Sequence, residues 1–531
     1  MYSCPLEGEK VMTSHLKISN NAFMRMMHTD HPTKRVVLSL SHPTSTDHDR
    51  LFYIKKNKSF NRFLFFLFSI QLGRMRYHEV EIDRGKDRFT IRNKYRFVRK
   101  IGSGAYGTVC SVVNIYTGDV IAIKKVHHIF DRKLTTKRCL REIKLLQHFN
   151  GHPRIIDIRE LDIVDHTNFN EIYLAQQCCD TTLADVIHSS QPLEEVHFQW
   201  FLYQILTGLK YIHSADVLHR DLKPANILVN QNCDIRICDF GMARGHIDDQ
   251  NYESWNLTQY VSTRWYRAPE IMLSRNSYNK SIDVWSLGCI FGEMLGRKVL
   301  FKGSDYVDQL HKIVAILGLP QDTSFWNTMA SPTVIEYIHN LRSPDGSPPP
   351  TDPVDFQSLY PQCSTNGINI LTQMLHLDPA KRITVDQALR HPYLADFRDP
   401  GEEYDCPRSF AFEPFEKVDS IDELRELIVK EVHAFEANRS ISSMSTGSSY
   451  SRRRYTGSSI ATRRSTQLAE ANEQAAASIN ENASLFTNQS HLVGEPEDMI
   501  ESDGEEPPPR RIVGPSHADV HAIERQLSGI W

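Results

Sequence analysis

The chain has 531 residues, with 61 Lys and Arg against 65 Asp and Glu, so its formal charge is −4, and 40% of its residues are hydrophobic. This is ordinary soluble-protein composition, which excludes collagen-like, wholly disordered and multi-span membrane classes. A strongly basic nucleic-acid binder is excluded as well, because no net positive charge collects phosphates, and we expect no nucleic-acid partner. By length alone, three or four domains are expected.

Cysteine usage and hydropathy predict where the chain resides. Ten cysteines are scattered, Cys178-Cys179 is their only adjacent pair, and no C-x-x-C occurs. This favours a reducing cytosol or nucleus without a disulfide framework or zinc site. The most apolar run, Phe63 to Phe68, is far shorter than the roughly 20 residues of a membrane-spanning helix, and it lies too deep in the chain for a signal peptide. We therefore expect no membrane partner.

The composition divides the chain into three parts. Residues 1–90 show no sustained period and are expected to be poorly ordered; a gene-model artefact, with translation starting at Met75, would also explain them. Residues 91–436 start with short β-like runs and continue with helical patterns, which predicts two lobes of α+β type. The helical stripe of one such pattern comprises Phe198, Phe201, Leu202, Ile205 and Leu209.

The remainder, residues 437–531, is rich in Ser and Arg and then acidic. Low hydrophobicity and clustered charge cannot repay the entropy of ordering, so we expect a disordered tail. One exception is the apolar stripe Val520, Ile523, Leu527 and Ile530, whose helical spacing would allow docking on a partner or on the folded domain.

A glycine-rich turn opens the central region. It reads Gly102-Ser103-Gly104-Ala105-Tyr106-Gly107 and is flanked by Ile101 and Val109. Alone this pattern is weak, because any tight turn would produce it. It lies between β-like runs and not before a helix, which disfavours a dinucleotide-binding fold. Its glycines would let backbone amides approach a triphosphate closely.

Charged motifs follow in a fixed order. The run Ile121-Ala122-Ile123-Lys124 predicts a strand that delivers a lysine, and Glu142, on a predicted helix, would pair with Lys124 and hold it on the α- and β-phosphates.

The decisive segment is His219-Arg220-Asp221-Leu222-Lys223-Pro224-Ala225-Asn226, followed by Asp239-Phe240-Gly241 and Ala268-Pro269-Glu270. Asp221 would orient or accept the hydroxyl proton of a substrate, Lys223 would steady the transferring phosphoryl group, and Asn226 and Asp239 would bind Mg²⁺. All five motifs in this order predict a protein kinase that uses ATP and Mg²⁺.

The motifs resemble those of the mitogen-activated (MAP) kinase family of Ser/Thr kinases. Thr258-Gln259-Tyr260, just before the run Val261 to Glu270, resembles the family's T-x-Y activation lip. The sequence of the segment from His213 to Asp221 most resembles that of the fungal cell-integrity branch. The resemblance implies a bilobal kinase fold with a β-rich N-lobe (about 91–179), a helical C-lobe (about 180–398), a docking and wrap-around segment (399–436) and disordered flanks.

The resemblance also implies how the lip acts. Phosphates on Thr258 and Tyr260 would add negative charge that arginines capture. The positions that match the family's phosphothreonine pocket are Arg141, Arg220 and Arg244, and those that match its phosphotyrosine pocket are Arg264 and Arg267. The middle residue departs from the family's usual Glu, Pro, Gly or Asp, so Gln259 leaves the upstream activator undetermined.

Further expectations come from the same resemblance. Gln176 matches the gatekeeper position, and Gln177 and Cys179 would offer backbone groups to adenine. Arg267 is expected to favour a proline after the phosphoacceptor. An acidic patch for basic-hydrophobic docking peptides would comprise Asp399, Glu402 and Glu403, for which a plain solvated charge run is the alternative.

The expected partners are ATP, proteins with Ser/Thr-Pro sites, an upstream dual-specificity MAP kinase kinase, and phosphatases and other docking-peptide proteins. The chain is expected to be a monomer in cytoplasm and nucleus, within a fungal stress, cell-wall or developmental cascade. Two alternatives remain: a catalytically weak kinase-fold scaffold, and a cyclin-dependent or glycogen-synthase-kinase-like relative. The complete motif set argues against the first, and the paired Thr258 and Tyr260 argue against the second.

Overall fold

The computed structural model describes residues 36–38, 52–54, 77–83, 85, 87–104, 107–166, 168–245, 263–273, 279–320, 325, 332–342, 346–445 and 466–471. The chain divides into two units, Met1–Asn93 and Lys94–Trp531. The Phe-rich run, the turn residues Ala105 and Tyr106, the lip residues Thr258 and Tyr260, and the 520–530 stripe all lie outside the described residues.

The described residues of the first unit form two antiparallel strand pairs. One joins β1 (Val36–Leu38) to β2 (Phe52–Ile54), and the other joins β3 (Tyr77–Ile82) to β4 (Asp87–Arg92). Phe89 and Ile91 alternate with polar residues along β4 and are buried, as expected of a strand with one apolar face. The prediction that residues 1–90 are poorly ordered is therefore corrected from Tyr77 onward.

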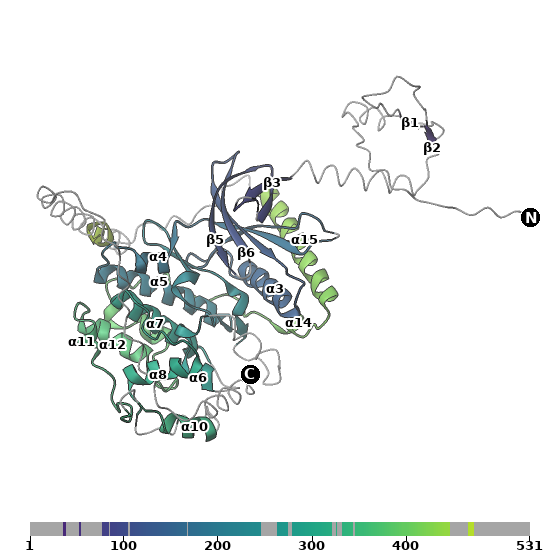
Figure 1. Cartoon of the computed structure of the whole chain (residues 1–531). Coiled ribbons are helices and arrows are strands. Elements are labelled where there is room, and N and C mark those ends of the chain that lie inside the picture. Colours follow the sequence, from purple (N-terminus) through teal and green to yellow (C-terminus); the bar gives the residue numbers. More distant parts are fainter. Residues whose placement is uncertain are drawn as a thin grey trace, which may run out of the picture. The chain divides into compact units, whose positions relative to one another are not determined.

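The second unit begins with a five-stranded antiparallel sheet, in the order β5-β6-β7-β9-β8 (Figure 1). Its strands are β5 (Tyr95–Gly104), β6 (Gly107–Asn114), β7 (Val120–His127), β8 (Ile158–Asp162) and β9 (Glu171–Gln177). The helix α3 (Lys133–His148) lies between β7 and β8 in the chain, and its apolar side chains Leu140, Ile143 and Leu146 are fully buried.

The rest of the second unit is mainly helical, which confirms the expected α+β, two-lobed architecture. Short strands and 3₁₀ turns around the site are β10 (Thr181–Thr182), β11 (Val217–Leu218), η1 (Pro224–Asn226), β12 (Ile227–Val229), β13 (Ile235–Ile237), η2 (Phe240–Met242), β14 (Arg244–Gly245), η4 (Arg264–Tyr266) and η5 (Pro392–Leu394). The helices are α4 (Leu183–His188), α5 (Glu195–Ser214), α6 (Pro269–Leu273), α7 (Ser281–Gly296), α8 (Tyr306–Leu317), α10 (Pro332–His339), α11 (Phe356–Leu359), α12 (Thr365–Met374), α13 (Val385–Leu389), α14 (Glu413–Glu416) and α15 (Ile421–Ser445).

Two helices form the centre of this lobe. The predicted stripe of α5 is buried along its whole length, from Phe198 to Leu209. α7 is buried on all sides, from Ile282 to Leu295, as expected of a helix that is apolar all round. None of the described helices is both long enough and apolar enough to cross a membrane.

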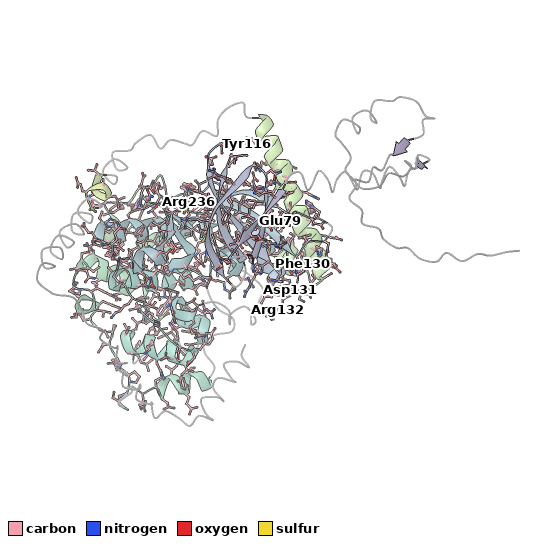
Figure 2. All side chains as sticks on the ribbon, turned by 45° about the horizontal axis from the view of Figure 1, so that its top comes forward. Glu79, Tyr116, Phe130, Asp131, Arg132 and Arg236 are labelled. Atoms are coloured by element: carbon pink, nitrogen blue, oxygen red, sulfur yellow. The ribbon has the colours of Figure 1, made fainter. Side chains whose placement is uncertain are left out.

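The C-terminal segment returns to the first lobe, where α15 lies along α3 and β8 (Figure 1). Leu424, Ile428 and Val432 form its buried stripe. The guanidinium of Arg425 lies 3.8 Å from the ring centroid of Phe130. Phe130, labelled in Figure 2, lies at the turn that leads into α3. The wrap-around segment thus supports the helix that carries Glu142.

The expected disordered tail needs a second correction. α15 continues to Ser445, nine residues beyond residue 436, the predicted end of the kinase domain. Residues 466–471 are also helical, and Leu468 is buried in the main core cluster. Leu468 and Ala471 are spaced three residues apart on one helical face, and a stripe this short is not distinguishable from chance in a polar sequence.

Four basic side chains on one face of α3 bind acidic groups of the C-terminal segment. Lys133 binds Asp419 at 2.9 Å, Arg141 binds Glu416 at 2.5 Å, and Lys144 binds Glu431. Lys137 donates to the backbone carbonyl of Glu416. We call Lys133, Lys137, Arg141 and Lys144 the α3 basic stripe; their spacing of three or four residues keeps them on one side of the helix.

We predict that Glu416→Gln lowers the free energy of unfolding by about 3 kcal/mol, because it leaves the fully buried Arg141 guanidinium without a counter-ion. Glu413→Gln, in the same segment, removes an exposed i,i+4 pair with Lys417 and should cost less than about 0.5 kcal/mol. Denaturant unfolding of the full chain measures both. Equal, small effects would show that Glu416 does not compensate Arg141.

Candidate active site

The glycine-rich turn lies at the end of the β5–β6 hairpin. Gly104 pairs with Gly107, and Gly102 pairs with Val109 across the two strands. A Cβ at Gly107 would lie 2.1 Å from the Lys125 carbonyl oxygen, so only glycine fits there. The hairpin therefore carries backbone close to β7, the strand that contains Lys124.

Lys124 and Glu142 form the ion pair that the spacing predicts. The Lys124 Nζ lies 2.6 Å from Glu142 Oε1, and both side chains are largely shielded from solvent. Burial alone would lower the pKa of Lys124, but the carboxylates of Glu142 and Asp239 outweigh it and raise that pKa well above its usual value. Lys124 is therefore a fixed positive charge between a helix and the loop that carries Asp239.

The segment from Arg220 to Asn226 holds the predicted catalytic groups in one loop. Lys223 Nζ lies 2.8 Å from Asp221 Oδ2, and Asn226 Nδ2 donates to the same oxygen at 3.0 Å. The Asn226 amide also donates to the Asp221 carbonyl at 2.8 Å. These bonds orient the Asp221 carboxylate and use the nitrogen of the Asn226 amide, which leaves the amide oxygen for a cation.

The loop is anchored from below by Asp283, a residue that sequence reasoning missed. Its fully buried carboxylate accepts the backbone N–H groups of His219 and Arg220, both at 2.9 Å, and binds His213 Nε2 at 2.8 Å. Burial raises the pKa of Asp283, but these donors outweigh it and hold the pKa below its usual value. The available signal was an acidic residue in the first turn of an otherwise apolar helix.

Backbone conformation adds a second constraint. Arg220 and Asp239 both adopt left-handed φ values of 65°. Such conformations are costly for residues other than glycine and persist where the surroundings enforce them, commonly at functional sites. Here the Asp283 bonds hold Arg220, and Gly241 N–H donates to Asp239 Oδ1 at 3.4 Å.

Asp239 faces a concentration of positive charge. Burial raises its pKa, whereas Lys124, Lys223 and His219 lower it, and the net pKa lies below the usual value. The structure thus brings together an ionised carboxylate, an amide oxygen and two ammonium groups. Oxygen ligands of this kind suit Mg²⁺, and the ammonium groups suit phosphate oxygens, so the residues fit a magnesium–nucleotide complex.

The proposed adenine-side residues lie at the end of β9. Gln177 pairs with Ile121 of β7, and Gln176 pairs with Ala122. Burial raises the pKa of the Cys179 thiol to about 11, and it raises that of Cys178 as well. Both thiols stay protonated near neutral pH, which agrees with a lining role and not with a redox device.

The arginines predicted to bind the lip fall into two groups. Arg141, Arg220 and Arg244 lie close enough for their charges to act on one another, and burial together with that repulsion lowers the pKa of Arg141 and of Arg244. Arg264 and Arg267 instead share Tyr306, with guanidinium carbons 5.4 and 5.8 Å from its ring centroid.

Two counter-groups in these clusters escaped sequence reasoning. Arg141 binds Glu416 and also donates to the Gly241 carbonyl. Arg267 donates to the Tyr306 hydroxyl. No local signal could reveal the Arg141–Glu416 pair, because 275 residues separate the partners.

The end of the predicted activation segment is fixed to the helical lobe by a buried ion pair. Arg382 binds Glu270 through two nitrogens, at 2.7 and 3.1 Å, and both side chains are almost completely buried. This bidentate geometry anchors the Ala268-Pro269-Glu270 motif to the helical lobe.

The three predicted docking acids lie together, but their charges are largely engaged. Glu402 Oε2 lies 3.4 Å from an Arg154 nitrogen, and Glu403 binds Arg398 at 3.0 Å. The Asp399 carboxylate accepts the Gly401 N–H at 2.9 Å. Sequence reasoning missed Arg154, which lies 248 residues from Glu402.

Comparison with known proteins agrees with this geometry. The family described as "Protein kinase domain" matches residues 95–394, more than half of the chain. The chain is 49% identical over 347 residues to "Mitogen-activated protein kinase mpkA" of Aspergillus fumigatus, covering 65% of this chain and 80% of that protein. It is 50% identical over 347 residues to MAP kinase MPS1 of Pyricularia oryzae, covering 65% and 81%. It is 47% identical over 351 residues to MAP kinase SLT2/MPK1 of Saccharomyces cerevisiae, covering 65% and 71%.

Proposed function

The chain belongs to the mitogen-activated protein kinases and is a protein Ser/Thr kinase, and we propose that it phosphorylates Ser or Thr followed by Pro after phosphorylation of Thr258 and Tyr260. The observation that carries the proposal is the Lys124–Glu142 pair, formed at 2.6 Å and facing Asp239. Members of this family use ATP with a divalent metal ion.

Each residue has a distinct task in this proposal. Lys124, held by Glu142, binds the α- and β-phosphates, while the backbone of Gly102 to Gly107 covers the triphosphate. Asp239 and Asn226 would hold Mg²⁺, which would supply positive charge to neutralise the phosphates. Ile101, Val109, Gln177 and Cys179 contact the nucleoside. These assignments use charge placement and positioning, which are the main needs of phosphoryl transfer.

Asp221 and Lys223 act on the other substrate. Asp221 accepts a hydrogen bond from the attacking hydroxyl and orients it. It takes the hydroxyl proton as the hydroxyl oxygen bonds to the γ-phosphorus of ATP and the bond from that phosphorus to the leaving ADP breaks. Lys223, 2.8 Å from Asp221 Oδ2, is placed to neutralise the transferring phosphoryl group. Two donors already fix the Asp221 carboxylate, so little reorganisation is needed when substrate binds.

Regulation through the lip is supported by the two arginine groups. Arg141, Arg220 and Arg244 carry more positive charge than Glu416 can neutralise, and a phosphate on Thr258 would supply the missing negative charge. Arg264 and Arg267 would receive phosphorylated Tyr260. An upstream dual-specificity kinase would add both groups, and phosphatases that use the docking surface would remove them.

The cellular setting follows from the relatives by analogy. We propose a monomeric kinase of the fungal cell-integrity branch that acts in cytoplasm and nucleus in a stress, cell-wall or developmental cascade. A scaffold without catalysis is the second candidate, but the intact Lys124–Glu142 pair and the ordered Asp221 loop disfavour it.

We predict that Lys124→Met lowers kcat by about 100- to 1,000-fold, because it removes the cation that holds the phosphates. Lys125→Met is the matched control: this neighbouring lysine binds Glu171, and its loss should leave kcat within about threefold of the parent. Phosphate transfer to a Ser-Pro peptide measures both. Near-parental turnover in Lys124→Met would refute the site, and no turnover in the parent, activated by phosphorylation, would favour the scaffold.

We predict that Thr258→Ala lowers activity after activation by at least about tenfold, whereas Gln259→Ala changes it by less than about threefold. The physical reason is that a phosphate on Thr258 would add negative charge beside the Arg141, Arg220 and Arg244 cluster, whereas Gln259 carries no charge. Phosphopeptide mapping of Thr258 and Tyr260 should accompany the assay. Equal losses in the two variants would remove the support for a phosphate-dependent lip.

A further inference from the structure

Arg154 is a buried cation inside the predicted acidic docking surface. It follows α3 and precedes β8, and it is only 7% exposed. Its Nη1 lies 2.5 Å from Gln204 Oε1 and 3.0 Å from Asp234 Oδ1, and its Nη2 lies 3.4 Å from Glu402 Oε2. The guanidinium carbon lies 5.1 Å from the ring centroid of Trp200. Three separate parts of the chain, α5 with Trp200 and Gln204, the turn with Asp234, and the segment with Glu402, therefore hold this side chain in place.

Arg154 pairs with one predicted docking acid and with a second, partly exposed acid. Glu402 is one of the three predicted docking acids, and its side chain is only 11% exposed. Asp234 is 39% exposed, so it presents charge to solvent while it binds Arg154. A second cation, Arg398, pairs with Glu403. The surface thus carries carboxylates whose charge is balanced mainly from within the protein.

A third cation lies nearby. Arg236 (labelled in Figure 2) donates to the backbone carbonyls of His152 and Ile155, next to Arg154 in the chain. Its charge interacts with that of Arg154 and of Asp234. Among the described acids of this surface, the Asp399 carboxylate accepts the backbone N–H of Gly401 at 2.9 Å. Because these arginines offset the carboxylate charges, the surface would attract a positively charged ligand only weakly.

We propose that Arg154 determines the charge selectivity of the docking surface, so that the surface distinguishes poorly between strongly basic and weakly basic docking peptides. The inference rests on the proposed function, because it assumes that Asp399, Glu402 and Glu403 form a docking surface. Arg154 neutralises Asp234 and Glu402 before any partner binds. Each added basic residue of a peptide therefore gains little, and the apolar part of the peptide supplies most of the affinity.

The test compares two synthetic peptides with one apolar anchor, preceded by three basic residues in one peptide and by three alanines in the other. Fluorescence anisotropy with the full chain at about 50 and about 200 mM salt measures their dissociation constants. The parent should bind the basic peptide at most about threefold more tightly. Arg154→Gln should bind it about threefold to tenfold more tightly than the parent at low salt, as expected for one uncompensated charge, with the neutral peptide unchanged.

Three controls keep the test decisive. Arg154→Lys retains the charge and should behave like the parent, and Asp234→Asn combined with Arg154→Gln should lose part of the gain. If Arg154→Gln does not fold, Arg398→Gln releases Glu403 at a more exposed position and should shift binding in the same direction. Basic-peptide affinity that does not rise in any charge-removing variant would overturn the inference, as would strong preference for the basic peptide in the parent.

The proposed function is tested separately. Phosphorylation of a short Ser-Pro peptide without a docking segment by the activated parent does not require this surface. Turnover together with unchanged docking in the Arg154 variants would overturn only the docking inference. Absent turnover would overturn only the proposed function.

Discussion

The ion pair between Lys124 and Glu142 is the interaction on which the rest of the site depends. Each charge is buried at a cost that the other helps to offset, and the two side chains meet at 2.6 Å. Lys124 comes from a sheet and Glu142 from a helix, so their meeting fixes α3 against β7. Any movement of α3 would separate the pair and remove the cation from its place opposite Asp239.

The C-terminal segment holds α3 in place through ion pairs and apolar packing. Acidic groups of residues 416–431 bind the α3 basic stripe, and the apolar stripe of α15 covers the same region. Two other buried carboxylates also hold elements of the site in place. Asp283, on α7, fixes the catalytic loop by accepting backbone N–H groups, and Glu270 fixes the end of the activation segment through its ion pair with Arg382. The catalytic groups are thus positioned by charged residues that never contact substrate.

The catalytic residues could be predicted from the sequence because their chemistry depends on short spacing. Asp221, Lys223 and Asn226 lie on one loop, and a strand that carries Lys124 can be recognised from a few residues. Partners distant in sequence could not be predicted, since Glu416 finds Arg141 and Glu402 finds Arg154 only after the chain has folded. The hairpin Tyr77–Arg92 and the extension of α15 to Ser445 were missed because their apolar alternation is short and interrupted by charge.

The central claim is that the C-terminal segment holds the Lys124–Glu142 pair through α3, and a charge swap tests it most directly. Lys144 and Glu431 bind one another, partly shielded from solvent and away from Lys124. The measurement is kcat at saturating ATP for the activated parent, Lys144→Glu, Glu431→Lys and the double swap. The account predicts that each single variant loses about fivefold, corresponding to about 1 kcal/mol, and that the double swap recovers most of it. Parental kcat in both single variants, or no recovery in the swap, would contradict it.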